Sequence, residues 1–206
     1  MKYYQVIVIG GGAGGITVAA GASSLGAKVA LIEKEPMPGG DCLHTGCVPT
    51  KSLVHSAKIV HATRLASEFG IISSGELSFG EANNRWNAAI QSIQKHDAPQ
   101  RFRALGVDVY QGLASFLDTY RVRIGSDVTL AGKRIVIATG SRPLLPPNPG
   151  LAEAGCLTNE TVVMGGGPIG LEFAQSFRRF GAEVTVVEMA PEILIKEDRE
   201  LVPFVR

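Results

Sequence analysis

The sequence predicts an α/β fold built on a parallel sheet, with a small antiparallel part and the beginning of a second unit of the first kind. The segment Val6–Gly15 (VIVIGGGAGG) is echoed by Val162–Gly170 (VVMGGGPIG), and each is followed by a helix-like stretch and a second apolar run. Those runs, Lys28–Ile32 and Glu183–Val187, are continuous rather than alternating, which is typical of parallel strands buried on both faces. Two successive βαβ beginnings are therefore predicted.

The region between the two copies predicts two helices and several short strands. Pro49 is favoured at a first helical position and opens a helix that runs to about Ser67. A second helical region follows over Phe79–Leu105, interrupted around Asp97 and Pro99. Short alternating segments between Gly, Asp and Ser turns then predict an antiparallel meander that returns to the main sheet. These segments are Val107–Tyr110, Ala114–Leu117, Arg121–Ile124, Val128–Leu130 and Arg134–Ala138.

A proline-rich stretch gives the best domain boundary. Arg142–Gly150 (RPLLPPNPG) contains four Pro, which continue neither a helix nor a central strand. We therefore expect one domain over residues 1–145 and a partial second domain over residues 146–206.

Charge and composition exclude several classes of protein. The 20 basic and 19 acidic residues nearly cancel, so no field exists that would hold nucleic acid. Every apolar run is shorter than the roughly 18 residues that a membrane span needs, and the N-terminal apolar run is too short for a secretory signal. A cytoplasmic protein is expected. Three Cys residues in such a chain do not predict a disulfide framework, so a Cys pair is rather catalytic or metal-binding.

The first glycine-rich segment predicts a phosphate-binding turn. Gly10 makes the tight turn, Gly12 lets the backbone approach a pyrophosphate, and Gly15 lets the helix pack on the strand. The helix N-terminus then offers free N–H groups and a partial positive charge. Glu33, at the end of the next strand, would accept hydrogen bonds from ribose hydroxyls. The alternative is a glycine-rich turn that binds nothing.

The second copy repeats this pattern with Gly165, Gly167 and Gly170, and its apolar run ends in Glu188. An acid at this position bonds a free 2′-hydroxyl and repels a 2′-phosphate, which favours NAD over NADP. The same alternative, a turn without a ligand, applies here. Asn159–Met164 is also shorter than the linker and strand expected before such a turn, as though about a dozen residues were deleted.

The most specific motif is Gly39–Lys51 (GGDCLHTGCVPTK), which contains two Cys residues near a helix N-terminus. Cys47 stands two positions before Pro49, where a thiolate is stabilised. Gly46 lacks a Cβ, so a flat ring could approach the neighbouring sulfur closely. A reversible disulfide between Cys42 and Cys47, within reach of a cofactor, is the functional interpretation. The alternatives are a zinc site from Cys42, Cys47, His44 and His55, or two unpaired buried thiols. The third cysteine, Cys156, has no partner in the sequence and is interpreted as a small apolar residue.

These residues resemble those of the class I pyridine nucleotide-disulfide oxidoreductases, a family that includes dihydrolipoyl dehydrogenase, glutathione reductase and mercuric reductase. The resemblance runs along the whole chain. It rests on GGGAGG, IEK, GGDCLHTGCVPTK, ATGSRP (Ala138–Pro143), GGGPIGLE and VVE, in that order.

The resemblance implies a Rossmann-like FAD-binding domain, followed by the start of an NAD(P)-binding Rossmann-like unit. It implies that Cys47 is the flavin-facing charge-transfer thiol and that Cys42 is the interchange thiol. Lys51 would lie near the flavin N5 and pair with Glu172. The implied cofactor contacts include Asp41, which stands where many relatives have Thr. They are Gly10, Gly12, Ala13, Gly14, Gly15, Glu33, Lys34, Gly40, Asp41, Cys42, Gly46, Cys47, Lys51, Ala114, Ala138, Thr139, Gly140, Ser141 and Arg142 for FAD, and Gly165, Gly167, Pro168, Ile169, Gly170 and Glu188 for NAD.

The implied activity is an electron relay from NAD(P)H through FAD and the Cys42–Cys47 disulfide to a small-molecule disulfide, dithiol or other acceptor. Some relatives run it in the reverse direction. No metal ligand is assigned. Relatives of this family are much longer homodimers, and their C-terminal domain carries a His–Glu pair that acts as acid-base catalyst. The alternative function is therefore a catalytically incomplete FAD-binding fragment.

Overall fold

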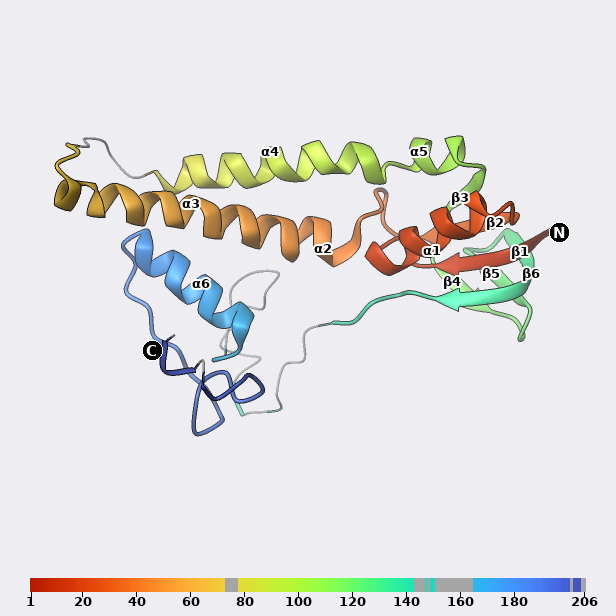
Figure 1. The fold of residues 1–206 in the computed structure, drawn as a ribbon. Coiled ribbons are helices and arrows are strands. Elements are labelled where there is room, and N and C mark those ends of the chain that lie inside the picture. Colours follow the sequence, from red (N-terminus) through yellow and green to blue (C-terminus); the bar gives the residue numbers. More distant parts are fainter. Residues whose placement is uncertain (73–77, 143–146, 148, 151–164, 201, 205–206) are drawn as a thin grey trace. The chain divides into compact units, whose positions relative to one another are not determined.

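The chain forms two compact units in the computed structural model (Figure 1). The first unit comprises Met1–Cys47 and Ala88–Arg142, and the second comprises Val48–Asn87 and Pro143–Arg206. The residues that the structure describes are 1–72, 78–142, 147, 149–150, 165–200 and 202–204.

The first unit is built on a six-stranded sheet with the strand order β3-β2-β1-β6-β5-β4. Strands β3, β2, β1 and β6 are parallel, and β6, β5 and β4 continue the sheet in antiparallel pairing. The mixed sheet confirms the predicted fold class. Its elements are β1 (Lys2–Ile9), α1 (Ala13–Ser24), β2 (Val29–Glu33), α2 (Gly40–His44), the second part of α4 (Phe79–Asp97), α5 (Pro99–Ala104), β3 (Val107–Gln111), β4 (Ala114–Phe116), β5 (Arg121–Ile124) and β6 (Val128–Ile137).

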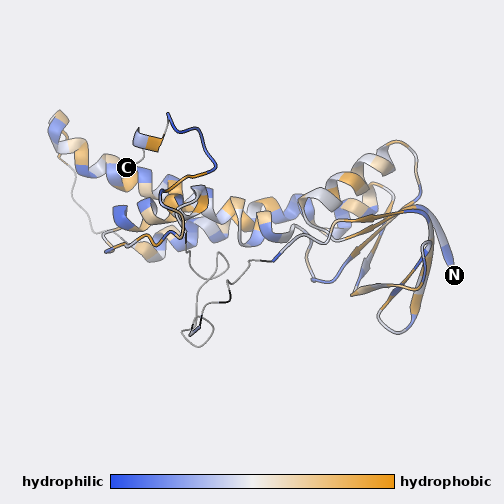
Figure 2. Ribbon diagram, turned by 90° about the horizontal axis from the view of Figure 1, so that it is seen from below, coloured by the Kyte–Doolittle hydropathy of each residue, from blue (hydrophilic) through white to orange (hydrophobic). Residues whose placement is uncertain are grey.

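Strands β1 and β2 are covered on both faces, which explains their continuous apolar sequences (Figure 2). Successive side chains of a strand point to opposite faces, so neighbours in sequence enter different clusters. One cluster joins the sheet to the meander strands and the other joins it to α1 and α5. The first contains Tyr4, Ile7, Ile9, Ala30, Ile32, Val122, Ile124 and Leu130, and the second contains Val8, Ala19, Val29, Leu31, Phe102 and Val107.

Two of the short segments differ from their predicted arrangement. Val107–Tyr110 was expected in the meander, but it forms most of β3, which pairs in parallel with β2 at the opposite edge. Val128–Leu130 and Arg134–Ala138 were expected as separate strands, and the structure joins nearly all of both in the single strand β6. Gly132, which suggested a turn between them, lies within this strand. A Cβ there would come 2.8 Å from the Ile7 side chain of β1, so a larger residue would force that side chain to move.

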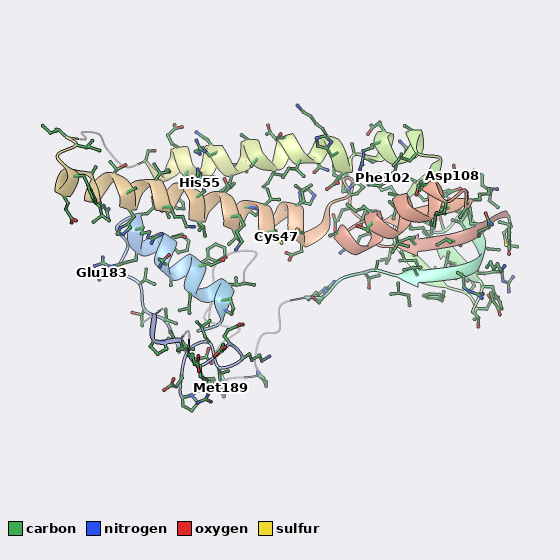
Figure 3. All side chains as sticks on the ribbon, in the orientation of Figure 1. Cys47, His55, Phe102, Asp108, Glu183 and Met189 are labelled. Atoms are coloured by element: carbon green, nitrogen blue, oxygen red, sulfur yellow. The ribbon has the colours of Figure 1, made fainter. Side chains whose placement is uncertain are left out.

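A polar network ties β3 to the sheet beneath the apolar core. The buried Tyr4 hydroxyl of β1 donates to Asp108 Oδ2 at 2.6 Å and lies 2.7 Å from the Tyr110 hydroxyl, both on β3. Strand β2 lies between β1 and β3 in the sheet, so this bond reaches from one strand to the next but one. Burial and the bond to Asp108 (labelled in Figure 3) raise the pKa of Tyr4 above its usual range. This Tyr therefore stays protonated and fixes the edge strand.

The second unit is formed mainly by helices held together by aromatic rings. Phe79, at the start of α4, contacts Trp86 on the same helix and Phe177 and Phe180 around the end of α6, with ring centroids 5.4–6.1 Å apart. Helix α3 (Cys47–Leu65) belongs to this unit from Val48 onward. The other elements are η1 (Ala66–Phe69), the first part of α4, α6 (Pro168–Arg179) and η2 (Val202–Phe204).

The predicted helix from Pro49 to Ser67 is present with shifted ends. It begins at Cys47 and continues to Leu65, followed by a 3₁₀ turn to Phe69. Pro49 therefore occupies the third helical position rather than the first. It fits there because the first four N–H groups of a helix have no intrahelical partner.

The predicted strand Glu183–Val187 is wrong: the structure gives this segment no regular secondary structure. A strand needs a neighbour for its backbone N–H and C=O groups, and none of the described residues pairs with it. The strand expected over Val162–Met164, the shortening before Gly165 and Cys156 lie outside the described residues. The domain division into residues 1–145 and 146–206 stays a prediction, because compactness does not test whether a segment folds alone.

No helix within the described parts of the chain is long and apolar enough to cross a membrane.

Candidate functional site

The first glycine-rich turn has the conformation that its sequence predicts. Gly10 has φ +106°, and a Cβ there would lie 2.2 Å from the Ala138 carbonyl oxygen. A Cβ on Gly15 would lie 1.8 Å from the Gly10 carbonyl oxygen, so the helix packs directly on the turn. Gly12 is the N-cap of α1, and because it has no side chain it cannot cap the first N–H groups of the helix. The first turn of α1 contains no acidic residue. These open N–H groups fit a phosphate.

Both oxygens of the Glu33 carboxylate accept hydrogen bonds from backbone N–H groups. Oε2 accepts the Gly11 N–H at 2.5 Å, and Oε1 accepts the Glu35 N–H at 2.9 Å. The residue ends β2 and is 9% exposed. The predicted ribose-binding acid therefore also fixes the glycine-rich turn.

The loop that leads to the two Cys residues packs on this turn. The Gly39 N–H donates to the Gly11 carbonyl oxygen at 2.8 Å, and Gly12 and Gly39 form an isolated β-bridge. A Cβ on Gly40 would lie 2.7 Å from the Gly12 Cα. Both Gly39 and Gly40 have positive φ, +128° and +59°. Only glycines allow this approach and these backbone angles.

Cys42 and Cys47 are brought together within the first unit. Cys42 lies in α2. Cys47, which is labelled in Figure 3, begins α3. Both are free thiols, Cys42 half-buried and Cys47 exposed, so they are not two buried inert thiols. His55 lies about two turns further along α3, and no group of three His, Cys, Asp or Glu among the described residues is placed to hold a metal. The zinc alternative is therefore not supported by this arrangement.

The environment of Cys42 disfavours its thiolate. Hydrogen bonding with the Cys47 thiol raises the pKa of Cys42 most, followed by burial, the charge of Cys47 and the charge of Asp41. A backbone hydrogen bond from Cys47 acts in the opposite direction. Cys42 therefore needs a base to become a nucleophile near neutral pH.

Lys51 and Glu172 form the predicted pair within the second unit. Lys51 Nζ donates to Glu172 Oε1, and the two side chains are 64% and 36% exposed. Lys51 follows Cys47 by one turn of α3, so both side chains lie on one side of that helix. Glu172 comes from α6, whose Ser176 hydroxyl donates to the Glu172 carbonyl oxygen at 2.7 Å. An exposed ion pair contributes only about 0–1 kcal/mol to stability, so the main effect of this one is to hold the Lys51 ammonium group in a fixed position.

The segment after β6 lies at the same edge of the sheet as the first turn. The Ala138 N–H donates to the Ile9 carbonyl oxygen and the Gly10 N–H to the Ile32 carbonyl oxygen, both at 2.8 Å. Ligands of parallel sheets bind at this carboxyl edge of the strands. Thr139, Gly140, Ser141 and Arg142 continue from it as an exposed segment, Lys34 pairs with Glu35 beside Glu33, and Ala114 begins β4.

The second glycine-rich turn has the same local conformation as the first. Gly165 has φ +115°, and Gly167 is the N-cap of α6, with Pro168 in its first turn. Glu188 Oε2 accepts the Gly166 N–H at 2.6 Å, and Oε1 accepts the Ala190 N–H at 2.8 Å. These bonds lower the pKa of Glu188, the bond from Ala190 most. Of the other predicted contacts, Ile169 is exposed and Gly170 buried.

The sequence reasoning missed three residues that shape this site. Gly11 and Gly39 join the turn to the loop before Cys42, and the Gly39–Gly40 doublet was a signal for such a close approach. Gln94 of α4 donates through Nε2 to the carbonyl oxygen of the buried Pro38 at 2.9 Å. No short-range pattern links Gln94 to a loop that lies 56 residues away.

Comparison with known proteins decides the family. The model of the pyridine nucleotide-disulphide oxidoreductases matches residues 4–206. The chain belongs to this family. It is 36% identical to a dihydrolipoyl dehydrogenase of Acholeplasma laidlawii, over 97% of this chain and 64% of the relative. It is 30% identical to a mercuric reductase of Lysinibacillus sphaericus, over 96% of this chain and 38% of that protein.

A solved structure of the family has the same fold. The copper(II) complex of the HOCl-induced flavoprotein disulfide reductase RclA from Escherichia coli matches with a TM-score of 0.79 and 30% identity. The match covers 100% of this chain and 46% of RclA. These relatives favour an oxidoreductase over an incomplete flavin-binding fragment.

The chain spans about half the length of the curated relatives it matches, between 46% and 64% of the first three. The first three alignments are 217–221 positions long, more than the 206 residues of this chain. These relatives therefore carry residues that have no counterpart here.

Proposed function

We propose that this chain is the N-terminal part of an FAD-dependent, NAD(P)H-linked disulfide oxidoreductase in which Cys42 and Cys47 form the redox disulfide. One observation carries the proposal: the loop that holds both Cys residues is docked on the glycine-rich turn through Gly39 and Gly12. A dinucleotide held by that turn would therefore lie beside the thiols. Family membership supports the same chemistry.

The residues of the first turn and of the carboxyl edge would hold FAD. Gly12, Gly14 and the N-terminus of α1 offer N–H groups to the pyrophosphate, since the first N–H groups of a helix have no intrahelical partner. Glu33 and the segment Ala138–Arg142 lie at the same edge. FAD, when bound, accepts a hydride from a nicotinamide and passes two electrons to a disulfide.

The Cys residues would carry the exchange with the substrate. Cys42, once deprotonated, attacks one sulfur of an external disulfide and releases a thiolate. Cys47 then attacks the Cys42 sulfur of the mixed disulfide, which releases the second thiolate and closes the Cys42–Cys47 bond. Two protons complete the released thiols, and one NAD(P)H supplies the hydride equivalent that reopens the protein disulfide. The reverse sequence oxidises a dithiol.

Several finer assignments belong to this proposal. Lys51 supplies a positive charge one turn after Cys47, where it would stabilise negative charge on the reduced cofactor. Glu188, ionised because its oxygens accept two N–H bonds, supports NAD over NADP. Homodimer formation and a cytoplasmic location rest on the family resemblance and the sequence. The substrates that the proposal covers are a lipoyl dithiol, a glutathione-type disulfide and a metal ion.

The test uses the oxidised 206-residue chain loaded with FAD under anaerobic conditions. NADH should release two thiols per chain, counted with a thiol reagent, and NADPH should act more slowly. Cys42→Ser and Cys47→Ser should release none, whereas Cys156→Ser should behave as the wild type. Failure to bind FAD would refute the cofactor assignment. Thiols that appear with dithionite but not with NADH would remove the nicotinamide step from this chain.

A further inference from the structure

Asp41 lies inside the redox loop and is held there by the loop itself. Its carbonyl oxygen accepts the Thr45 N–H at 2.9 Å and the Gly46 N–H at 2.6 Å. Its carboxylate Oδ1 accepts the Thr45 hydroxyl. The other oxygen, Oδ2, lies 3.0 Å from the position that a Cβ on Gly46 would occupy. The carboxylate is therefore folded over the turn that separates Cys42 from Cys47.

This geometry revises the reason for the glycine at position 46. A Cβ there would crowd the carbonyl oxygen and Oδ2 of Asp41, both at 3.0 Å. The glycine makes room for the acid, whether or not a ring approaches the neighbouring sulfur. Gly46 therefore leaves space for the Asp41 carboxylate, and the hydrogen bond from the Thr45 hydroxyl holds the carboxylate there.

The carboxylate is the charged group that acts on Cys42 from outside the Cys pair. The pKa of Cys42 is raised first by Cys47 and by burial, and the charge of Asp41 adds to them. Asp41 is exposed, so a molecule that approaches Cys42 from solvent meets its charge.

We propose that Asp41 is a specificity-determining residue that makes Cys42 react preferentially with neutral or cationic disulfides and dithiols and disfavours anionic ones. The inference rests on the proposed function only in giving Cys42 the exchange role. A fixed negative charge lowers the local concentration of anions and destabilises the transition state of their attack. The substrate class is therefore a disulfide or dithiol without a carboxylate near its sulfurs.

The test compares two alkylating reagents that differ in charge, iodoacetate and iodoacetamide, on the reduced 206-residue chain. Alkylation at Cys42 is counted by mass spectrometry of its peptide, which separates it from Cys47. The ratio of the two rate constants cancels the fraction of thiolate, so it reports the charge that the reagent meets. Asp41→Asn keeps an oxygen for Thr45, and we expect it to raise the iodoacetate-to-iodoacetamide ratio about twofold to fivefold at low salt.

Matched controls separate charge from fold. Asp118→Asn removes an exposed carboxylate from the same unit, where it pairs with Arg121, and should leave the ratio unchanged. Thr45→Val removes the hydroxyl bond but keeps the charge, so its ratio should stay close to that of the wild type. Salt at about 1 M should move the wild-type ratio toward that of Asp41→Asn without any substitution.

An unchanged ratio in Asp41→Asn, or a wild-type ratio insensitive to salt, would overturn the inference. The measurement needs no FAD and no turnover. If the ratio changes but Cys42 does not exchange with a disulfide, the proposed function fails and the charge effect stands.

Discussion

The two glycine-rich turns share their local structure and differ in what surrounds them. In both, the first glycine has a positive φ, +106° at Gly10 and +115° at Gly165, and an acid 22 residues after the second glycine accepts its N–H. The first turn connects β1 to α1, and the strand after this helix, β2, pairs with β1 in the sheet. The second is followed by a segment without regular structure, residues 183–188.

The difference shows which part of the motif is local and which is not. A Cβ on Gly10 would meet the Ala138 carbonyl oxygen at 2.2 Å, whereas the nearest atom among the described residues to a Cβ on Gly165 is Glu188 Oε2, at 3.9 Å. The glycines, the helix N-terminus and the acid define the turn within about thirty residues of chain. The strands need neighbours from elsewhere in the sequence, and β1 has β2 and β6. The second copy keeps its turn, while the apolar side chains of its later run are exposed: Val184, Val186 and Val187 are 37%, 39% and 64% exposed.

The largest expected effect comes from placing a methyl group in each turn. Gly10→Ala should lower the free energy of unfolding of the first unit by about 3–5 kcal/mol, because backbone strain adds to the clash with Ala138. Gly165→Ala meets the strain but no clash with the described residues, and it should cost about 1–3 kcal/mol. Urea unfolding followed by far-UV circular dichroism, and by the fluorescence of Trp86 for the second unit, gives both values.

Gly14→Ala is the control for this pair. A Cβ there would meet no atom of the described residues within 4 Å, and Ala is the better helix former by about 0.5–1 kcal/mol, so this variant should be neutral or slightly stabilising. Equal losses in Gly10→Ala and Gly165→Ala would show that the second turn is packed as tightly as the first.

The second contrast lies in the apolar runs that follow the two helices. Leu31 is 0% exposed, and Leu31→Ala should cost about 3 kcal/mol, since the lost contacts leave a cavity between the sheet and α1. Val187 is 64% exposed, and Val187→Ala should change the stability by at most about 0.5 kcal/mol. The urea midpoints and slopes of the two variants check this. A loss above about 1.5 kcal/mol for Val187→Ala would mean that this segment is buried in solution.

These contrasts also explain how much the sequence could predict. The first βαβ beginning, the break at Asp97–Pro99 and the pairing of Lys51 with Glu172 were accessible, because each depends on a short motif or on the family resemblance. The parallel placement of β3 and the continuity of β6 through Gly132 were not, because partner strands decide them. Gln94, which bonds Pro38, was missed for the same reason.

The third comparison concerns the acids of the two turns, and its outcome depends on pH. Glu188→Gln weakens the acceptors of the Gly166 and Ala190 N–H groups and should lower the urea midpoint reported by Trp86 at pH 7. The pKa of Glu188 is lowered in the folded protein, so its stabilisation is complete above its ordinary value of 4.5 and is lost as pH falls through the folded value.

The difference between wild type and Glu188→Gln should therefore be constant from about pH 7 to pH 5.5 and should shrink below about pH 4.5. Glu183→Gln, at an exposed position of the same segment, is the matched control and should leave the midpoint unchanged.

Glu33→Gln should cost more than Glu188→Gln at pH 7, about 1–3 kcal/mol, because Glu33 is 9% exposed and its replacement amide donor would face the Gly11 or Glu35 N–H. If the two substitutions cost the same, the surroundings of the two turns would not matter, and the acids would act through their local bonds alone.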